Sequence, residues 1–220
     1  MKKILILSNM YPSKKYPHYG VFVQNSAAIL RNGGYKVSVC SIPKCDNKFV
    51  RLLAYCWAYT KCVFLGAFGG YDCLYAHFVS HTAVPARILK RIRPKMYLVE
   101  NAYGNDAVIQ TKEDDGRNIE CSRKILPFAD RVIVPSSYFK EMVAKTFDYP
   151  TDKIFVSPSG GVNREILYPV DMQKARKQCG LEESAYYIGL IGRITAGKGW
   201  DTAIKAVKMV QEKNIIPNLK

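Results

Sequence analysis

The sequence predicts an α/β fold in which a doubly wound, mostly parallel sheet is followed by one strand and one helix of an incomplete second domain. Three observations predict it. Short runs of β-branched residues alternate with segments of helical periodicity, which is the pattern of βαβ units. These runs are almost continuously apolar, as strands buried on both faces of a parallel sheet are. The length of 220 residues allows one domain with a sizeable core and part of another.

The strands and helices follow one another along the chain. Strands are predicted at residues 3–8, 36–42, 73–77, 96–100, 131–136, 153–158 and 186–192. A helix is predicted after Gly20, and the glycine pair at 33–34 ends it. Its apolar face is formed by residues about one turn apart, namely Val23, Ala27 and Leu30. Ser136 or Ser137 is expected to cap the helix after the fifth strand.

The most apolar region of the chain is residues 49–71. Arg51 and Lys61 interrupt it, and no uncharged run reaches the roughly 20 residues that span a bilayer. We interpret it as a helix packed against the sheet. The alternative is a helix that lies on a membrane surface.

The C-terminal part differs in character from the rest. Residues 158–186 contain prolines, glycines and a short charged helical piece, which indicates a linker. A final helix is predicted after residue 199, with one apolar stripe formed by Trp200, Ala203, Ile204, Val207 and Val210. The predicted domains are therefore residues 1–165, a linker at 166–185, and the start of a second domain at 186–220. One strand and one helix do not make a domain, so we expect the natural protein to continue.

Composition indicates which binding partners and which cellular compartment to expect. The formal net charge of +15 favours anionic partners, such as phosphorylated substrates or acidic lipid headgroups. Nucleic acid is not expected, because no recognisable binding module accompanies the charge. The seven cysteines are odd in number and form no Cys-x-x-Cys pair, so reduced thiols are expected rather than a zinc site or a disulfide framework. The N-terminus is predicted to be a buried strand rather than a secretory signal, and a cytoplasmic location is expected.

The stretch "GLIGRITAGKGW", residues 189–200, is one residue short of a Walker A loop. Gly199 stands where the magnesium-binding Ser or Thr would be, so a triphosphatase is disfavoured. Arg193 and Lys198 nevertheless flank a predicted helix N-terminus, where free N–H groups attract phosphate. Two such cations can clamp a diphosphate. The alternative is a basic turn with solvated side chains, and the residues alone leave both interpretations open.

The same stretch, extended as "IGRITAGKGWDTAIKAV", resembles the first strand, loop and helix of the C-terminal domain of retaining GT-B glycosyltransferases of family 4, whose domains are Rossmann-like. Upstream, "VSPSGGVNREILYP" resembles the interdomain stretch of that family, with Asn163 in place of the usual Asp. "ADRVIVPSSYFKEMV" and "SNMYPSKKYPHYGVFVQNSAAIL" resemble a strand–helix unit and the first strand, loop and helix of the N-terminal domain. The resemblance covers nearly the whole chain, and the Arg/Lys loop and the interdomain stretch are its most specific parts.

The resemblance implies an activity and site residues. The complete enzyme would transfer a sugar from a nucleotide-diphosphate donor to a polysaccharide or lipid-linked acceptor, with retention. Arg193 and Lys198 would bind the donor diphosphate, and Gly20 would open the helix that faces donor phosphate and acceptor. No metal and no cofactor is implied, because the two cations can offset the leaving-group charge. The setting would be the cytoplasmic face of the membrane, with peripheral contact to anionic lipid.

The sequence also departs from the family. In "NAYGND", Tyr103 stands where the family often has a His near the reacting sugar, and Asp106 stands where it has an Asp. Tyr can donate a hydrogen bond but is a poorer proton carrier. His77 occupies a position after the third strand where the family often has a His. A His at such a position has a structural role more often than a catalytic one. His81 is expected to start a helix, and His18 is assigned an acceptor contact in the loop before Gly20.

Two further features leave alternatives open. The basic run "RILKRIRPK" carries Arg87, Lys90, Arg91, Arg93 and Lys95, read either as a solvated helix end or as a contact for an anionic membrane or a lipid diphosphate. The family's pair of Glu residues, which are separated by seven intervening residues and hold the donor, is absent from this sequence. This chain is therefore expected to be inactive alone, and a non-catalytic α/β binding fragment is the alternative function. A dehydrogenase is disfavoured, because no Gly-x-Gly-x-x-Gly follows the first strand.

Overall fold

The computed structural model describes residues 2–104, 106, 107, 116–158 and 164–220. The chain divides into two compact units, Met1–Gly161 and Val162–Lys220, which are described separately below. Gly161 and Asn163 of the predicted interdomain stretch lie outside the described residues.

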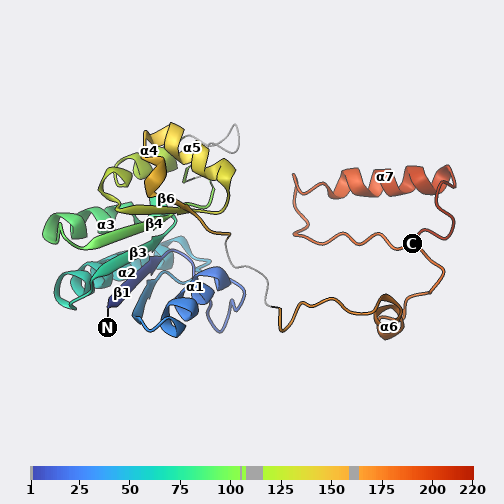
Figure 1. The fold of residues 1–220 in the computed structure, drawn as a ribbon, viewed down its shortest axis with the longest axis horizontal. Coiled ribbons are helices and arrows are strands. Elements are labelled where there is room, and N and C mark those ends of the chain that lie inside the picture. The colour runs from blue at the N-terminus through green and yellow to red at the C-terminus, as the bar shows by residue number, and fades with distance from the viewer. Residues whose placement is uncertain (1, 105, 108–115, 159–163) are drawn as a thin grey trace. The chain divides into compact units, whose positions relative to one another are not determined.

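The first unit is built on a six-stranded sheet in which every pair of neighbouring strands is parallel (Figure 1). The strand order is β2-β1-β3-β4-β5-β6. The bounds are β1 Lys3–Ser8, β2 Lys36–Ser41, β3 Cys73–His77, β4 Tyr97–Asn101, β5 Arg131–Val134 and β6 Ile154–Val156. The predicted α/β class and parallel sheet are confirmed. Each of the six strands coincides with a predicted run, and most of their ends differ from the prediction by no more than about one residue.

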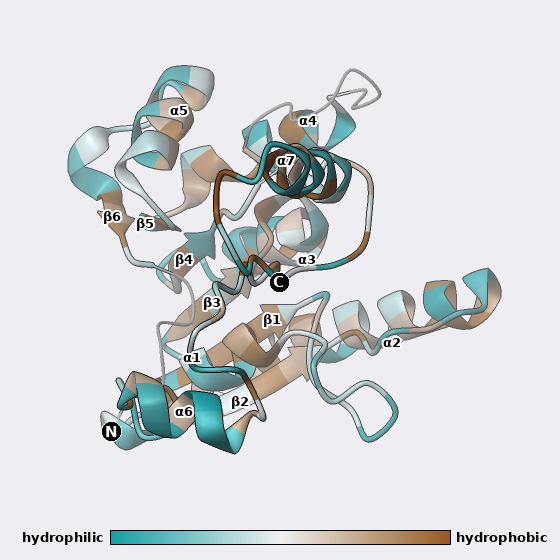
Figure 2. Ribbon diagram, turned by 90° about the vertical axis from the view of Figure 1, so that its right-hand side faces the viewer, coloured by the Kyte–Doolittle hydropathy of each residue, from teal (hydrophilic) through white to brown (hydrophobic). Residues whose placement is uncertain are grey.

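Helices cover the two faces of this sheet unequally. Helix α1 (Val21–Asn32) packs on one face, where Val23 and Ala27 join Ile4 and Ile6 in a small cluster. The other face carries the main core, covered by α2 (Lys48–Phe68), α3 (Val79–Ile92), α4 (Arg117–Arg123) and α5 (Ser137–Phe147), with short 3-10 turns at Leu126–Phe128 and Thr151–Lys153. Figure 2 shows α1 and α2 on opposite sides of the sheet.

The helix starts follow from local chemistry. Gly20, at φ 80°, precedes α1, as predicted. The Ser136 hydroxyl accepts a hydrogen bond from the Phe139 N–H at 3.4 Å, which confirms it as the cap of α5. Asn47 caps α2 by accepting from the N–H groups of Phe49 and Val50.

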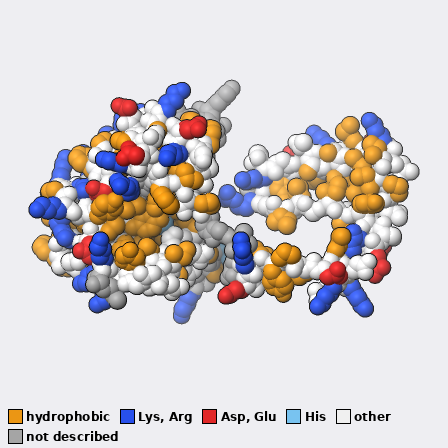
Figure 3. All heavy atoms as spheres, in the orientation of Figure 1, with side chains coloured by type: hydrophobic (Ala, Val, Ile, Leu, Met, Phe, Trp, Pro, Cys, Tyr) orange, Lys and Arg blue, Asp and Glu red, His pale blue; other side chains and the backbone are white. Residues whose placement is uncertain are grey.

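The expectation that the sheet is buried on both faces is wrong for its β6 edge. The apolar residues that share the α1 face on β4, β5 and β6 are Tyr97, Val99, Ile133 and Phe155, and Phe155 is 64% exposed. Helix α1 lies over β1 and leaves this apolar strip without a helix among the described residues. Figure 3 shows hydrophobic side chains gathered on this side of the first unit.

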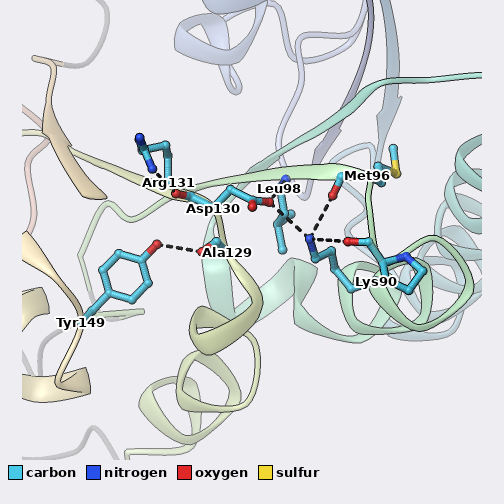
Figure 4. A network of polar contacts seen from close by, with 8 residues as sticks. Lys90, Met96, Leu98, Ala129, Asp130, Arg131 and Tyr149 are labelled. Carbon is cyan, nitrogen blue, oxygen red and sulfur yellow. Dashed lines mark hydrogen bonds and ion pairs between the residues drawn. The ribbon is translucent and has the colours of Figure 1, made fainter. Parts of the chain in front are cut away.

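A polar network holds the end of α3 to the strands beside it (Figure 4). The Lys90 Nζ donates to the carbonyls of Pro94 and Met96, at 3.1 and 3.0 Å, and lies 3.2 Å from Asp130 Oδ2. The same carboxylate accepts from the Leu98 N–H at 2.7 Å. This network therefore joins α3, the first residues of β4 and the turn that enters β5.

The second unit contains α6 (Met172–Gln178) and α7 (Trp200–Glu212). The predicted helix after residue 199 is confirmed, but the strand predicted at 186–192 is reduced to one parallel bridge between Tyr186 and Leu219. A strand needs a partner along its length, and residues 218–220 supply the hydrogen bonds here only to Tyr186 and Ile188. Most of the residues from 187 to 199 are consequently exposed.

Candidate functional site

The order of the strands marks one edge of the first unit as a candidate binding site. After β1 the chain moves to β2 on one side and then returns to β3 on the other side, so the order reverses between β1 and β3. In open α/β sheets, ligands bind outside the carboxyl ends of the strands at such a switch point. Three strands end here in buried polar residues, namely Ser8, His77 and Asn101.

Gly20 fixes the approach of α1 to this edge. Its φ of 80° is in the left-handed region, and a Cβ at this position would lie 2.7 Å from both the Met10 carbonyl carbon and the Tyr11 nitrogen. Side chains are excluded for both reasons. The absence of a side chain thus lets the segment that follows β1 touch the N-terminus of α1.

Tyr103 and His77 form a hydrogen-bonded pair beside Gly20. The Tyr103 hydroxyl lies 2.7 Å from His77 Nδ1, and the two rings are nearly parallel at 13°. Phe22, from the first turn of α1, and Phe78 pack against the Tyr103 ring at 5.1 and 4.8 Å. The structure therefore joins His77, which ends the third predicted strand, to Tyr103, which follows the fourth.

His77 is held in its neutral form. The residue is fully buried, and this burial lowers the pKa of its imidazole to about 3. Its Nε2 atom is buried and has no hydrogen-bond partner among the described residues. A neutral imidazole next to a phenol can accept or donate one proton in their shared hydrogen bond, so His77 orients the hydroxyl of Tyr103.

Asp106 makes contacts of a different kind. Its carboxylate accepts hydrogen bonds from the backbone N–H groups of Val79, Tyr103 and Gly104, at 3.2, 3.1 and 2.7 Å. The residue is fully buried, and this burial raises the pKa of its carboxyl against the opposing effect of these bonds. These hydrogen bonds tie the turn after β4 to the first turn of α3, and thereby hold Tyr103 in place.

Two residues of this edge were not singled out from the sequence. Glu100 is fully buried next to Thr82, whose hydroxyl lies 3.4 Å from Oε2, and desolvation raises the pKa of its carboxyl well above the ordinary range. A charged residue within the apolar run "MYLVE" was the available signal. Phe78 has a φ of 67° at the cap of α3, a conformation that non-glycine residues rarely adopt and that the sequence does not announce.

A cleft of ≈ 240 Å³ opens from this edge under α1. It is lined by Phe22, Asn25, Ser26, Ile29, Tyr75, Asn101, Tyr103, Ile133, Ser157 and Pro158. The Asn101 amide donates to the Tyr75 hydroxyl at 2.9 Å, which fixes two polar groups of the lining. Apolar walls with a few oriented polar groups are typical of small-molecule sites.

The other predicted site residues belong to the second unit. Arg193 and Lys198 flank the loop before α7, whose cap is Gly199 at φ 76°. The Arg193 carbonyl accepts from the Thr195 N–H and from the Trp200 indole, both at 2.9 Å, and these bonds close the loop. Both cationic side chains are exposed and form no ion pair with the described residues.

The remaining histidines are placed as follows. His81 is the third residue of α3, which confirms it as a helix-start residue, and its carbonyl accepts from the Tyr59 hydroxyl. His18 is exposed in the loop before Gly20. In the described part of the chain, no three His, Cys, Asp or Glu side chains are grouped so as to hold a metal ion.

Comparisons with known proteins extend this description. No protein-family model matches the chain. The D-inositol 3-phosphate glycosyltransferase of Stackebrandtia nassauensis is 28% identical over 99 residues, which are 44% of this chain and 22% of that protein. The chain thus aligns with less than a quarter of the length of this curated relative.

Solved structures share the fold. Anabaena Alr3699/HepE in complex with UDP-glucose matches with a TM-score of 0.61 at 19% identity, over 100% of this chain and 59% of that one. Sucrose-phosphate synthase from Thermosynechococcus elongatus matches with a TM-score of 0.66 at 15% identity, over 100% and 70%. UDP-GlcNAc 2-epimerase from Methanocaldococcus jannaschii also matches, with a TM-score of 0.57 at 9% identity over 100% and 64%. By sequence resemblance and by fold, the chain is similar to the GT-B glycosyltransferases.

Proposed function

We propose that this chain is the acceptor-side domain and the first donor-binding segment of a glycosyltransferase that uses a nucleotide-diphosphate sugar. One observation carries the proposal: the Gly-Arg-x4-Lys-Gly loop ends at the N-terminus of a 13-residue helix, α7, with both of its cations exposed. Helix N-termini attract phosphate, and exposed Arg and Lys side chains can close on a diphosphate. An epimerase shares this fold as well. The sequence resemblance to the curated glycosyltransferase supports sugar transfer rather than epimerisation.

The first unit would hold the acceptor. The cleft under α1 presents Asn25, Asn101 and Tyr103 beside apolar walls, which suits a sugar or a lipid-linked sugar. In this proposal Tyr103, oriented by His77, donates or accepts a hydrogen bond to a hydroxyl of the bound sugar. Retention is proposed from the family resemblance alone. No metal is needed in this proposal, because Arg193 and Lys198 offset the charge that grows on the leaving diphosphate.

Residues 1–220 alone are proposed to transfer no sugar. The second unit has one long helix, no sheet among its described residues, and few buried apolar side chains. No pair of Glu residues with the spacing of the family is present in the chain. The alternative function, a non-catalytic binding fragment, predicts acceptor binding at the cleft without donor turnover in any longer version of the protein.

The test measures release of the nucleoside diphosphate from a panel of UDP-, GDP- and ADP-sugars. It compares the 220-residue chain with any longer chain that the same reading frame encodes. Turnover by the longer chain alone is the expected result. Clear turnover by the 220-residue chain would contradict the proposed inactivity, and no turnover by the longer chain with any donor would favour the binding fragment.

Substitutions in the loop test the donor site. In the active protein, Arg193→Ala and Lys198→Ala should each lower kcat/KM by roughly ten- to a hundredfold, because a lost charge-assisted contact costs about 1.5–3 kcal/mol. Lys205→Ala is the control, since Lys205 lies on α7 outside the loop. Gly199→Ser completes a Walker A pattern, yet it should confer no magnesium-dependent ATP hydrolysis. Normal donor kinetics in both alanine variants would reduce the loop to a basic turn.

A further inference from the structure

Helix α2 is apolar on the side that faces away from the protein. Its buried residues are small, namely Ala58, Cys62 and Gly66. Five of its large apolar residues are exposed on the opposite side, at positions that share one helical face: Val50, Leu53, Trp57, Phe64 and Phe68. Surface helices of globular proteins ordinarily have the reverse arrangement, with large apolar residues toward the core.

Close packing explains why the small residues face inward. A Cβ on Gly66 would lie 2.6 Å from a methyl group of Leu89, which is itself buried in α3. The two helices therefore approach closely at this point, which leaves no room for a larger side chain at Gly66. Trp57, Phe64 and Phe68 are 71%, 62% and 78% exposed.

Helix α3 continues the same apolar surface. Val84, Ile88 and Ile92 are exposed at intervals of four residues, so they form one stripe along the helix. A hollow of ≈ 460 Å³ lies between this stripe and Phe64 and Phe68 of α2. We call these residues of the two helices the α2–α3 surface. Single exposed apolar residues are ordinary, whereas a contiguous patch marks an interaction site.

The region around this surface is strongly basic. Between Asn47 and Val99 the chain has eight Lys and Arg residues and a single acidic residue, Asp72, which accepts a hydrogen bond from the Lys3 N–H. Two of the eight cations serve the fold: Lys90 in the network with Asp130, and Arg93, which donates to the carbonyls of Gly66 and Tyr71. The other six side chains form no hydrogen bond or ion pair with the described residues: Lys48, Arg51, Lys61, Arg87, Arg91 and Lys95.

We propose that the α2–α3 surface docks on an anionic lipid bilayer. The exposed aromatic side chains would enter the interface between headgroups and acyl chains, and the unpaired cations would contact lipid phosphates. In the parts of the chain that the structure describes, no helix is apolar and long enough to traverse a bilayer, so α2 would lie along the surface. A second copy of the chain fits less well, because a two-fold contact would set these cations against each other. The proposal does not depend on sugar transfer.

Vesicle binding tests the charge component. The 220-residue chain should co-sediment with vesicles of phosphatidylcholine and phosphatidylglycerol, bind vesicles of phosphatidylcholine alone much less, and be released by salt. Each cation near an anionic membrane is worth about fivefold in binding, so Arg87→Gln/Arg91→Gln/Lys95→Gln should weaken it about a hundredfold. The control variant Lys140→Gln/Lys145→Gln/Lys153→Gln removes the same charge elsewhere. An equal loss in both variants would overturn the proposal in favour of net charge alone.

Tryptophan fluorescence tests the apolar component. The chain has two tryptophans, so Trp200→Phe leaves Trp57 as the only reporter. Its emission should shift to the blue on mixed vesicles and be quenched by lipids brominated on their acyl chains. Trp57→Ser/Phe64→Ser/Phe68→Ser should lower vesicle binding at least tenfold, whereas Phe128→Ser/Tyr138→Ser/Phe155→Ser, at other exposed positions, should not. Binding without quenching of Trp57 would overturn the proposal. The proposal would also be overturned if the chain did not bind vesicles but formed a dimer, or a complex with an acidic protein, that the Trp57→Ser/Phe64→Ser/Phe68→Ser variant could not form.

Discussion

At the scale of single residues, the site edge depends on a glycine whose role is steric. Gly20→Ala should lower the free energy of unfolding by about 2 kcal/mol, because an alanine at positive φ is strained and its Cβ would meet backbone atoms at 2.7 Å. Gly34→Ala is the matched control: φ is 85° there, and a Cβ would meet nothing within 4 Å. Urea unfolding of both variants measures the difference. Equal losses would show that the contact with Met10 and Tyr11 contributes nothing.

A second residue-scale prediction concerns His77 and pH. Its folded-state pKa, about 3, lies below the unfolded value of about 6.5. Protons therefore bind the unfolded chain first, and the stabilisation is present above about pH 6.5 and is lost as the pH falls toward the folded pKa. Relative to His77→Gln, the wild-type protein should lose about 1.4 kcal/mol of stability per pH unit in this window.

The measurement for His77 is urea unfolding at several pH values between the two pKa values. His18→Gln is the control, because it removes an exposed imidazole in place of the buried one. A wild-type protein and a His77→Gln variant with parallel pH profiles would mean that the imidazole titrates normally in the folded state, and that it is not held neutral beside Tyr103.

At the scale of secondary-structure elements, six of seven predicted strands formed and one did not. The first six strands have parallel neighbours, as the near-continuous apolar character of their runs predicted. The run at 186–192 has equal apolar character, yet only Tyr186 finds a bridge partner, in Leu219. The periodicity of a segment indicates its preference for a strand conformation. It does not indicate whether a neighbouring strand is present to pair with it, because that depends on distant residues.

The candidate site shows the same division. Tyr103 and Asp106 were identified from their positions in one motif, but their different contacts were not. Asp106 accepts from three backbone N–H groups, and Tyr103 meets His77 from another strand. These contacts depend on the register of β3 against β4, which pairs His77 with Asn101. Likewise, the basic run at 87–95 was read as one feature, and the structure divides it into cations that hold the fold and cations that face outward.

The Lys90 network yields a prediction at this scale. Lys90→Met should lower the free energy of unfolding by about 2 kcal/mol, because it removes three contacts and leaves the Asp130 carboxylate without its cation. Lys95→Met is the control, since Lys95 is exposed and lies in the same basic run. Thermal or urea unfolding of both variants gives the comparison. A loss no larger than that of the control would show that the network is a surface contact of little weight.

At the scale of the whole molecule, the two units differ in how much core they contain. Both clusters of buried apolar residues lie between Ile4 and Ile154, within the first unit. The buried apolar residues of the second unit are Ala185 and Leu219 among those described, and α7 buries none. The predicted boundaries at 165 and 185 stay a prediction, while the contacts already show where the folding free energy must be concentrated.

This difference predicts how pieces of the chain behave. Residues 1–161 should unfold cooperatively with a midpoint within about 3 °C of that of the 220-residue chain, which corresponds to about 1 kcal/mol in a domain of this size. Residues 162–220 should show no cooperative transition, because two buried apolar side chains cannot offset the conformational entropy of nearly sixty residues. Circular dichroism during heating, on both pieces and on the whole chain, makes the comparison. A midpoint for residues 1–161 more than about 10 °C lower would mean that the second unit supports the sheet domain, and that the core of the first unit is not sufficient for its stability.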